Sequence, residues 1–239
     1  MRASRIRNRA APGGGGGGTL ATLSFVAGTP FEATASVTAS DPVAYPTGMT
    51  SGDYTILVCA LNGSTGTITA PVGWAELLPY TQGVLSTSAV HAIFYRAYAS
   101  GDTEPVVSCK SGRLAVLPVR VRGADPATLL EVPATVNQQT VAGTTIDAPA
   151  VTSTTSNVMC CTFMGRSSSS GIFPTFTPPG GVTEVGEATG QAVGATNAGV
   201  SFNISDITPG ASSGFKTGTA SSTLTGGMGV SFVLKRGTA

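Results

Sequence analysis

Two segments of this 239-residue sequence, about a hundred residues apart, share one pattern. Each segment, 53–77 and 157–185, has an apolar strand, a turn of Gly, Ser and Thr, a second short strand, and the element P-x-G-x-x-E with an aliphatic residue after it. At a constant offset of 108, the shared residues are Pro71 and Pro179, Gly73 and Gly181, Glu76 and Glu184, and Leu77 and Val185. An internal repeat constrains the whole fold at once. It also indicates an architectural role, because a catalytic site seldom needs to appear twice.

The composition predicts an all-β chain. Only 10% of the residues are charged, against about 25% in an average globular domain. The 32 glycines and 15 prolines, together with abundant Thr, Ser, Ala and Val, favour short strands and tight turns. No window of useful length keeps a helical period while staying clear of Gly and Pro.

We expect the body, residues 19–239, to be built from two diverged repeat halves at about 43–123 and 146–237. The stretch 124–145 lacks a strong period and is predicted to cross from one half to the other. Pro118 is expected to place its strand at a sheet edge or a bulge. Each half is too small to bury its sheet alone, so the two halves should share one core. The prediction is a jelly-roll-like two-sheet β-sandwich. The alternative is two sequential immunoglobulin-like sandwiches, for which the Cys…Trp…Cys spacing is missing.

Residues 1–18 form an extended basic arm that ends in six consecutive glycines. Its first nine residues contain no acid and four arginines: Arg2, Arg5, Arg7 and Arg9. The arm lacks the apolar stretch of a signal peptide, and no segment of the chain is long enough to span a membrane. Because no aromatic residues are interleaved with the arginines, we prefer docking into an acidic groove of a neighbouring protein to nucleic-acid binding.

The four cysteines, Cys59, Cys109, Cys160 and Cys161, lack the spacing of a disulfide framework. We expect reduced, packed thiols, with one incidental disulfide as the alternative. Adjacent strand residues point to opposite faces, so Cys160 and Cys161 should not serve one site together.

No catalytic, cofactor or metal site is predicted. His91, the only histidine, is expected at a sheet surface, without the carboxylate or cysteine that a catalytic or metal site requires. Glu76 and Glu184 could be imagined as the acids of a glycosidase, which must face each other at about 5–10 Å. Equivalent positions of two repeats tend to lie apart, so we expect two exposed strand residues instead. The glycine tract has no Gly-Lys-Ser/Thr ending and is a linker.

One candidate binding site remains. Trp74 and Tyr80 could flank a loop-lined platform for a sugar. The alternative is that Trp74 belongs to the core. The second half has Val182 in place of Trp74, which argues against two equal sites.

The order of these segments carries a family resemblance. LVCALNG is followed by TITAPVGW, then by a strand that contains Tyr95 and Arg96, and then by VRVRGADPATLLEVP. Over about 43–236 this resembles the β-sandwich virion proteins of tailed bacteriophages, of the minor tail, tail-fibre or head-decoration type. The resemblance implies a non-enzymatic structural protein, assembled in the host cytoplasm and exposed on the particle surface. It implies docking onto other virion proteins through the arm and a homo-oligomer, with a trimer as one option.

The alternative function is a carbohydrate-binding adhesin that recognises a host-surface glycan through loops near Trp74 and Tyr80. A polysaccharide-degrading enzyme is the weakest hypothesis, because the sequence offers no catalytic set.

Overall fold

The computed structural model describes residues 19–63, 67–85, 89–155, 158–169, 171–190 and 196–238, and the arm of residues 1–18 lies outside them. Every regular element in these ranges is a strand. This part of the chain has no helix of the length and apolarity that crossing a membrane requires. The prediction of an all-β fold is confirmed.

Residues 24–122, called the first half from here on, form one sheet, and three of its strands precede the predicted start of the first repeat at about 43. In spatial order, its main path consists of β1 (Ser24–Ala27), β8 (Ser108–Arg122), β4 (Tyr54–Gly63), β7 (Ala89–Ala97) and β6 (Ala75–Gln82). Three short strands also pair with the long strand β8: β2 (Phe31–Glu32), β3 (Val37–Ala39) and β5 (Ile68–Thr69). All of these pairings are antiparallel.

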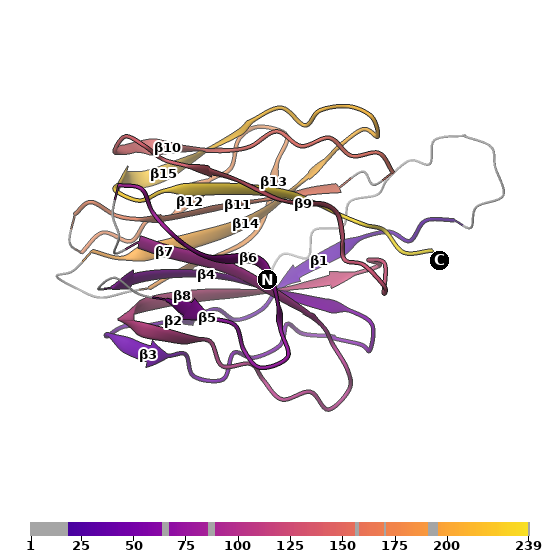
Figure 1. The fold of residues 1–239 in the computed structure, drawn as a ribbon, viewed down its shortest axis with the longest axis horizontal. Helices are drawn as coiled ribbons and strands as arrows, with labels where there is room; N and C mark the ends of the chain where they lie inside the picture. The colour runs from indigo at the N-terminus through magenta and orange to yellow at the C-terminus, as the bar shows by residue number, and fades with distance from the viewer. Residues whose placement is uncertain are drawn as a thin grey trace.

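The second half forms two further sheets. The larger one has the order β13 (Thr183–Thr189), β14 (Ala198–Asp206), β11 (Val158–Arg166), β16 (Met228–Leu234) and β9 (Leu130–Gln138). The smaller one has the order β10 (Gly143–Ala148), β15 (Lys216–Leu224) and β12 (Phe176–Thr177). In Figure 1 the second half, in orange and yellow, lies above the first half, in indigo and magenta.

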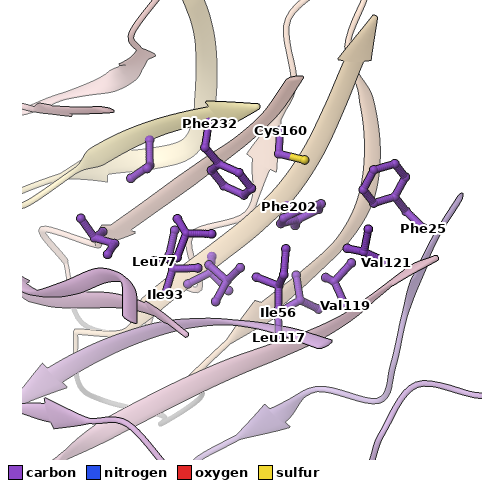
Figure 2. Packing of buried hydrophobic residues seen from close by; sticks show 14 of the residues in the cluster. Phe25, Ile56, Leu77, Ile93, Leu117, Val119, Val121, Cys160, Phe202 and Phe232 are labelled. Atoms are coloured by element: carbon purple, nitrogen blue, oxygen red, sulfur yellow. The ribbon is translucent and has the colours of Figure 1, made fainter. Parts of the chain in front are cut away.

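The two large sheets share one hydrophobic core. Alternate residues of β4 and β8, such as Ile56 and Leu117, pack with alternate residues of β14 and β16, such as Phe202 and Phe232. Figure 2 shows these side chains pointing towards each other from facing sheets, with Phe25 of β1 and Cys160 of β11 among them. Burial of this apolar surface from both halves is the main stabilising term. The predicted two-sheet sandwich is confirmed.

The repeated P-x-G element forms the same turn in both halves. The amide of Trp74 donates to the carbonyl of Pro71 at 3.1 Å, and the amide of Val182 donates to that of Pro179 at 3.2 Å. Gly73 and Gly181 have φ values of +79° and +76°, a region that side chains with a Cβ rarely adopt. Each turn leads into an edge strand, β6 in the first large sheet and β13 in the second. Counted from these edges, the strands β7, β4, β8 and β1 of the first sheet take the places of β14, β11, β16 and β9 of the second.

The jelly-roll detail of the prediction is not supported. Each large sheet is drawn from one half of the chain, so the chain does not alternate between facing sheets. Each half instead covers the outer face of its own sheet. Leu57 and Phe94 belong to a second cluster on the outer side of the first sheet, and Met159 and Phe163 belong to a third cluster between the second sheet and the smaller one.

The expected crossover at 124–145 is wrong in part, because it contains β9 and the start of β10. Pro133 is the reason why no strand was predicted here. It is tolerated because β9 is an edge strand, where the N–H group that proline lacks is not needed for pairing on both sides. The expectation for Pro118 is also wrong, since β8 pairs with β4 along one side and with β1 and then β2 along the other. Pro118 lies where β1 has ended and β2 has not begun.

The cysteines are free and buried, as predicted. Cys160 belongs to the core between the large sheets, and Cys161 belongs to the cluster on the opposite face of β11. Burial raises the pKa of Cys109 to about 11 and that of Cys161 to about 12. These thiols are therefore packed hydrophobic groups that stay protonated at neutral pH.

Candidate functional site

The four arginines of the arm lie outside the described residues. The first and the last described residues lie side by side, because Leu20 forms a β-bridge with Thr238. The amide of Ala21 donates to the carbonyl of Gly237 at 2.8 Å, and Arg236 Nε donates to the carbonyl of Ala21 at 2.6 Å. These bonds fix the position where residue 19 joins the body.

Trp74 lies beneath the first sheet, with 9% of its surface exposed, and packs in the outer cluster with Phe94 and Val116. The turn from Pro71 to Trp74 aims the indole into that cluster. The backbone of Tyr80 lies in β6, and its side chain is outside the described part of the structure. The structure therefore places Trp74 mainly in the core, with one edge at the surface.

A hollow of about 310 Å³ lies beside this edge of Trp74. Its lining residues come from the turn before β6, from β7, and from the loop that leads into β8: Pro71, Val72, Trp74, Arg96, Thr103, Glu104, Pro105, Val106 and Ser108. Val72, at the tip of the turn, is 97% exposed. The hollow thus combines the apolar side chains of Trp74 and Val72 with charged and hydroxyl groups.

An ion pair holds the charged side of this hollow in place. Arg96 Nη2 lies 2.7 Å from Asp102 Oδ1, and the amide of Ala99 donates to Asp102 Oδ2 at 2.8 Å. Behind it, Tyr45 and Tyr98 meet edge to face with their ring centroids 5.0 Å apart, and Tyr45 donates to the carbonyl of Thr103 at 3.2 Å. Burial, followed by the charge of Asp102, raises the pKa of the Tyr45 phenol.

Sequence reasoning did not associate Arg96 or its ion-pair partner Asp102 with Trp74, although Arg96 and Trp74 line the same hollow. A signal was present, because Asp102 follows the turn residues Ser100 and Gly101, where an Asp commonly accepts bonds from nearby amides. Local pattern does not reveal the approach of this turn to the Pro71–Trp74 turn.

The expectation for His91 is wrong. His91 was expected at a sheet surface, but it is completely buried, on the same face of β7 as the core residue Ile93. Neither ring nitrogen has a hydrogen-bond partner within the described structure. Burial lowers the pKa of His91 to about 4, so the ring is neutral at physiological pH. Strand alternation identified its face correctly, but not that the second half covers this face.

Glu76 and Glu184 do not form a pair. Glu76 stands opposite Phe94, whose side chain belongs to the outer cluster of the first sheet. Glu184 stands opposite Asn203, on the face of β14 that points away from the core residue Phe202. The two carboxylates therefore lie on opposite outer faces of the sandwich and are both exposed, in line with the expectation of exposed strand residues.

A second hollow, of about 380 Å³, lies where β9 turns into β10. It is lined by the amide side chains of Asn137, Gln138 and Gln139 and by Val141, which is 74% exposed.

Over the described ranges, no three His, Cys, Asp or Glu side chains gather in a way that could hold a metal ion. No family model, curated protein or solved structure matches this chain.

Proposed function

We propose that this protein is a non-enzymatic structural component of a virus particle, of the tailed-bacteriophage type that its sequence resembles. Its β-sandwich body is displayed at the particle surface, and residues 1–18 attach it to other particle proteins. The observation that carries this proposal is the contrast between the two parts of the chain. The body satisfies its own packing through one core shared by both halves, whereas the arm concentrates four arginines within nine residues.

The place where the described chain begins is in line with the same proposal. Residues 20–21 are tied to 237–238 at one place on the body. A particle that binds the arm would therefore hold the body by that place. A neighbouring protein with an acidic groove is the partner that four arginines fit best.

Deletion of residues 1–18 tests this proposal. The shortened chain, 19–239, should unfold at the same denaturant concentration as the full chain, because no part of the core is lost. It should nevertheless fail to join particles, as measured by immunoblotting of purified particles and by antibody labelling in negative-stain images. Normal incorporation of the shortened chain would refute attachment through the arm.

A second function, recognition of a host-surface glycan, is favoured by the hollow beside Trp74. Sugars bind where an apolar face lies next to hydrogen-bonding groups, and the hollow offers the Trp74 edge, Arg96 and Glu104 together. Because Trp74 is also a core residue, its replacement would confuse loss of binding with loss of folding.

The cleaner test is Val72→Glu, which introduces a charge into the wall of the hollow at a position that is almost fully exposed. Val141→Glu at the second hollow is the matched control. On a glycan array or on host cells, binding by the wild-type protein and by Val141→Glu, but not by Val72→Glu, would support this function. No binding by the intact protein would remove it.

A further inference from the structure

Four strands stand last in the strand orders of the two large sheets: β1 and β6 in the first, β9 and β13 in the second. Such an edge strand can pair with another chain, so folded proteins protect it by shortness, prolines, bulges or charged side chains. β1 has only four residues, and β6 contains Pro79 and two register shifts. β13 has a bulge and carries Glu184 and Glu187. These three edges are therefore protected.

The segment 135–138 of β9 lacks such protection. Its pairing with β16 is regular, and both Pro133 and the register shifts of β9 come before it. Within the described structure, no strand other than β16 pairs with β9. The charged residues nearest to it in the sequence are Glu131 and Asp147. This segment is thus an open strand edge without charged side chains.

The peptide groups of Val136 and Gln138 point away from β16. The amide of Gln139 donates to the carbonyl of Gly227 at 2.8 Å, so Gln139 directs its peptide groups towards β16. Successive residues of an antiparallel strand alternate in this direction. Asn137 therefore also directs its peptide groups towards β16, whereas Val136 and Gln138 direct theirs to the open edge. Each of these two residues offers an N–H donor and a carbonyl acceptor to a further strand.

Apolar side chains are exposed beside these peptide groups. Val136 stands opposite Val230 of the shared core, but 38% of its surface is exposed. Val84, which follows the edge strand β6, is 64% exposed, and its amide donates to Oε1 of Gln138 at 3.0 Å. Leu85, next to Val84, is also exposed. We call residues 136–138, Val84 and Leu85 the flank surface. Exposed apolar residues that lie together with polar groups are typical of a site of protein association.

The chemistry of the flank surface fits a second copy of the same chain. In a dimer with twofold symmetry, each residue near the axis meets the same residue of the other copy. A charged residue there would meet its like, which opposes pairing. The two stretches that contain the flank surface, 77–90 and 132–146, have no charged residue. The side chains of Asn137 and Gln138 carry both donors and acceptors, so each can pair with its own kind.

We propose that two copies of the chain form a dimer by antiparallel pairing of their β9 strands, about a twofold axis beside Asn137. This register places Val136 of each copy opposite Gln138 of the other, so the outward peptide groups of both residues are used. An axis beside Val136 would instead pair Gln138 with Ala134, where the register of β9 begins to shift. The two second sheets then form one continuous sheet. This association does not depend on residues 1–18.

The first test is sedimentation equilibrium of the full chain from about 1 to about 100 μM, the range over which a weak dimer forms. The wild-type protein should approach twice the monomer mass of 23.8 kDa. Val136→Lys should stay a monomer, because the axis would bring two positive charges together. Its ammonium group can reach water, so the urea midpoint should stay close to that of the wild type. Val72→Lys, the same change in the turn before β6, is the control and should dimerise.

Cross-linking tests the register. Asn137 would meet its own copy in a pair without hydrogen bonds, where the Cα atoms lie about 4.5 Å apart and a disulfide can form. With diamide, which oxidises two thiols to a disulfide, Asn137→Cys should become a covalent dimer that dithiothreitol separates. Glu184→Cys, at an exposed position of the edge strand β13, should not. A monomeric or trimeric wild-type protein, an unchanged dimer in Val136→Lys, or a dimer in which Asn137→Cys does not cross-link would each overturn the proposal.

Discussion

Arg166 Nε lies 2.7 Å from Oδ1 of Asn62, and this hydrogen bond joins β11 of the second sheet to β4 of the first at one end of the shared core. Asn62 Nδ2 also donates to Oγ1 of Thr196, and Arg166 Nη2 donates to the same oxygen at 3.0 Å. Asn62 is buried. The two halves are therefore connected by polar contacts as well as by hydrophobic packing.

Replacement of Asn62 with Ala should lower the free energy of unfolding by about 1–3 kcal/mol, the usual cost of leaving a buried polar group without its partner. The measurement is urea unfolding followed by tryptophan fluorescence. Ser36→Ala is the control, because it removes an exposed hydroxyl–hydroxyl contact to Ser111. Equal and small effects of the two substitutions would show that the Asn62 contacts do not hold the halves together.

Gly73→Ala and Gly181→Ala should each destabilise the protein by about 1–2 kcal/mol, because both glycines have positive φ. Gly180 lies within the second turn, beside Gly181, but has no positive φ, and a methyl group added to its Cα would have no atom within 4 Å. Gly180→Ala should therefore leave stability unchanged or raise it slightly. Urea midpoints of the three variants provide the comparison, and a neutral Gly181→Ala would contradict the equivalence of the two turns.

His91 should make the protein sensitive to acid. Its pKa is about 4 in the folded state and about 6.5 in the unfolded chain, so the unfolded state binds more protons between these values. The contribution is fully present above pH 6.5 and is lost as the pH falls towards 4, by on the order of 3 kcal/mol in total. In His91→Leu, the free energy of unfolding should fall less between pH 7 and pH 4.5 than in the wild-type protein. Identical pH profiles would contradict a neutral, buried histidine.

The thiols should be inert in the folded protein. All four cysteines are buried and free, and burial raises their pKa values. Ellman's reagent should therefore react slowly with the native protein, first at Cys109, and should count four thiols in denaturant. Two thiols in denaturant would reveal a disulfide, and fast reaction of the native protein would contradict the packing.

Much of the fold could be predicted from local pattern. Alternation placed Cys160 and Cys161 on opposite faces correctly, because the side chains of a strand alternate in every environment. The repeated Pro and Gly were predicted to be architectural, but the two turns that they form, with Gly73 and Gly181 at positive φ, were not predicted. Which face of a strand is covered depends on how the two sheets pack together. The burial of His91 could therefore not be predicted from the sequence.

The candidate sites were harder to predict, because they depend on contacts between distant segments. Trp74 was identified, but Arg96, which lines the same hollow, comes from β7, and the sheet determines how close the two residues lie. The shared face of Glu184 and Glu187 could not be predicted either, because it depends on the bulge in β13. A regular strand would turn the two side chains to opposite faces.

Attachment through the arm is tested most directly by one comparison in the full chain. Arg2, Arg5, Arg7 and Arg9 are replaced together by Ala, and co-sedimentation of the protein with purified particles is measured. If the arm attaches the body, the variant will keep the wild-type unfolding midpoint and stay in the supernatant, while the wild-type protein sediments with the particles. Sedimentation of the variant at the wild-type level would contradict attachment through these arginines.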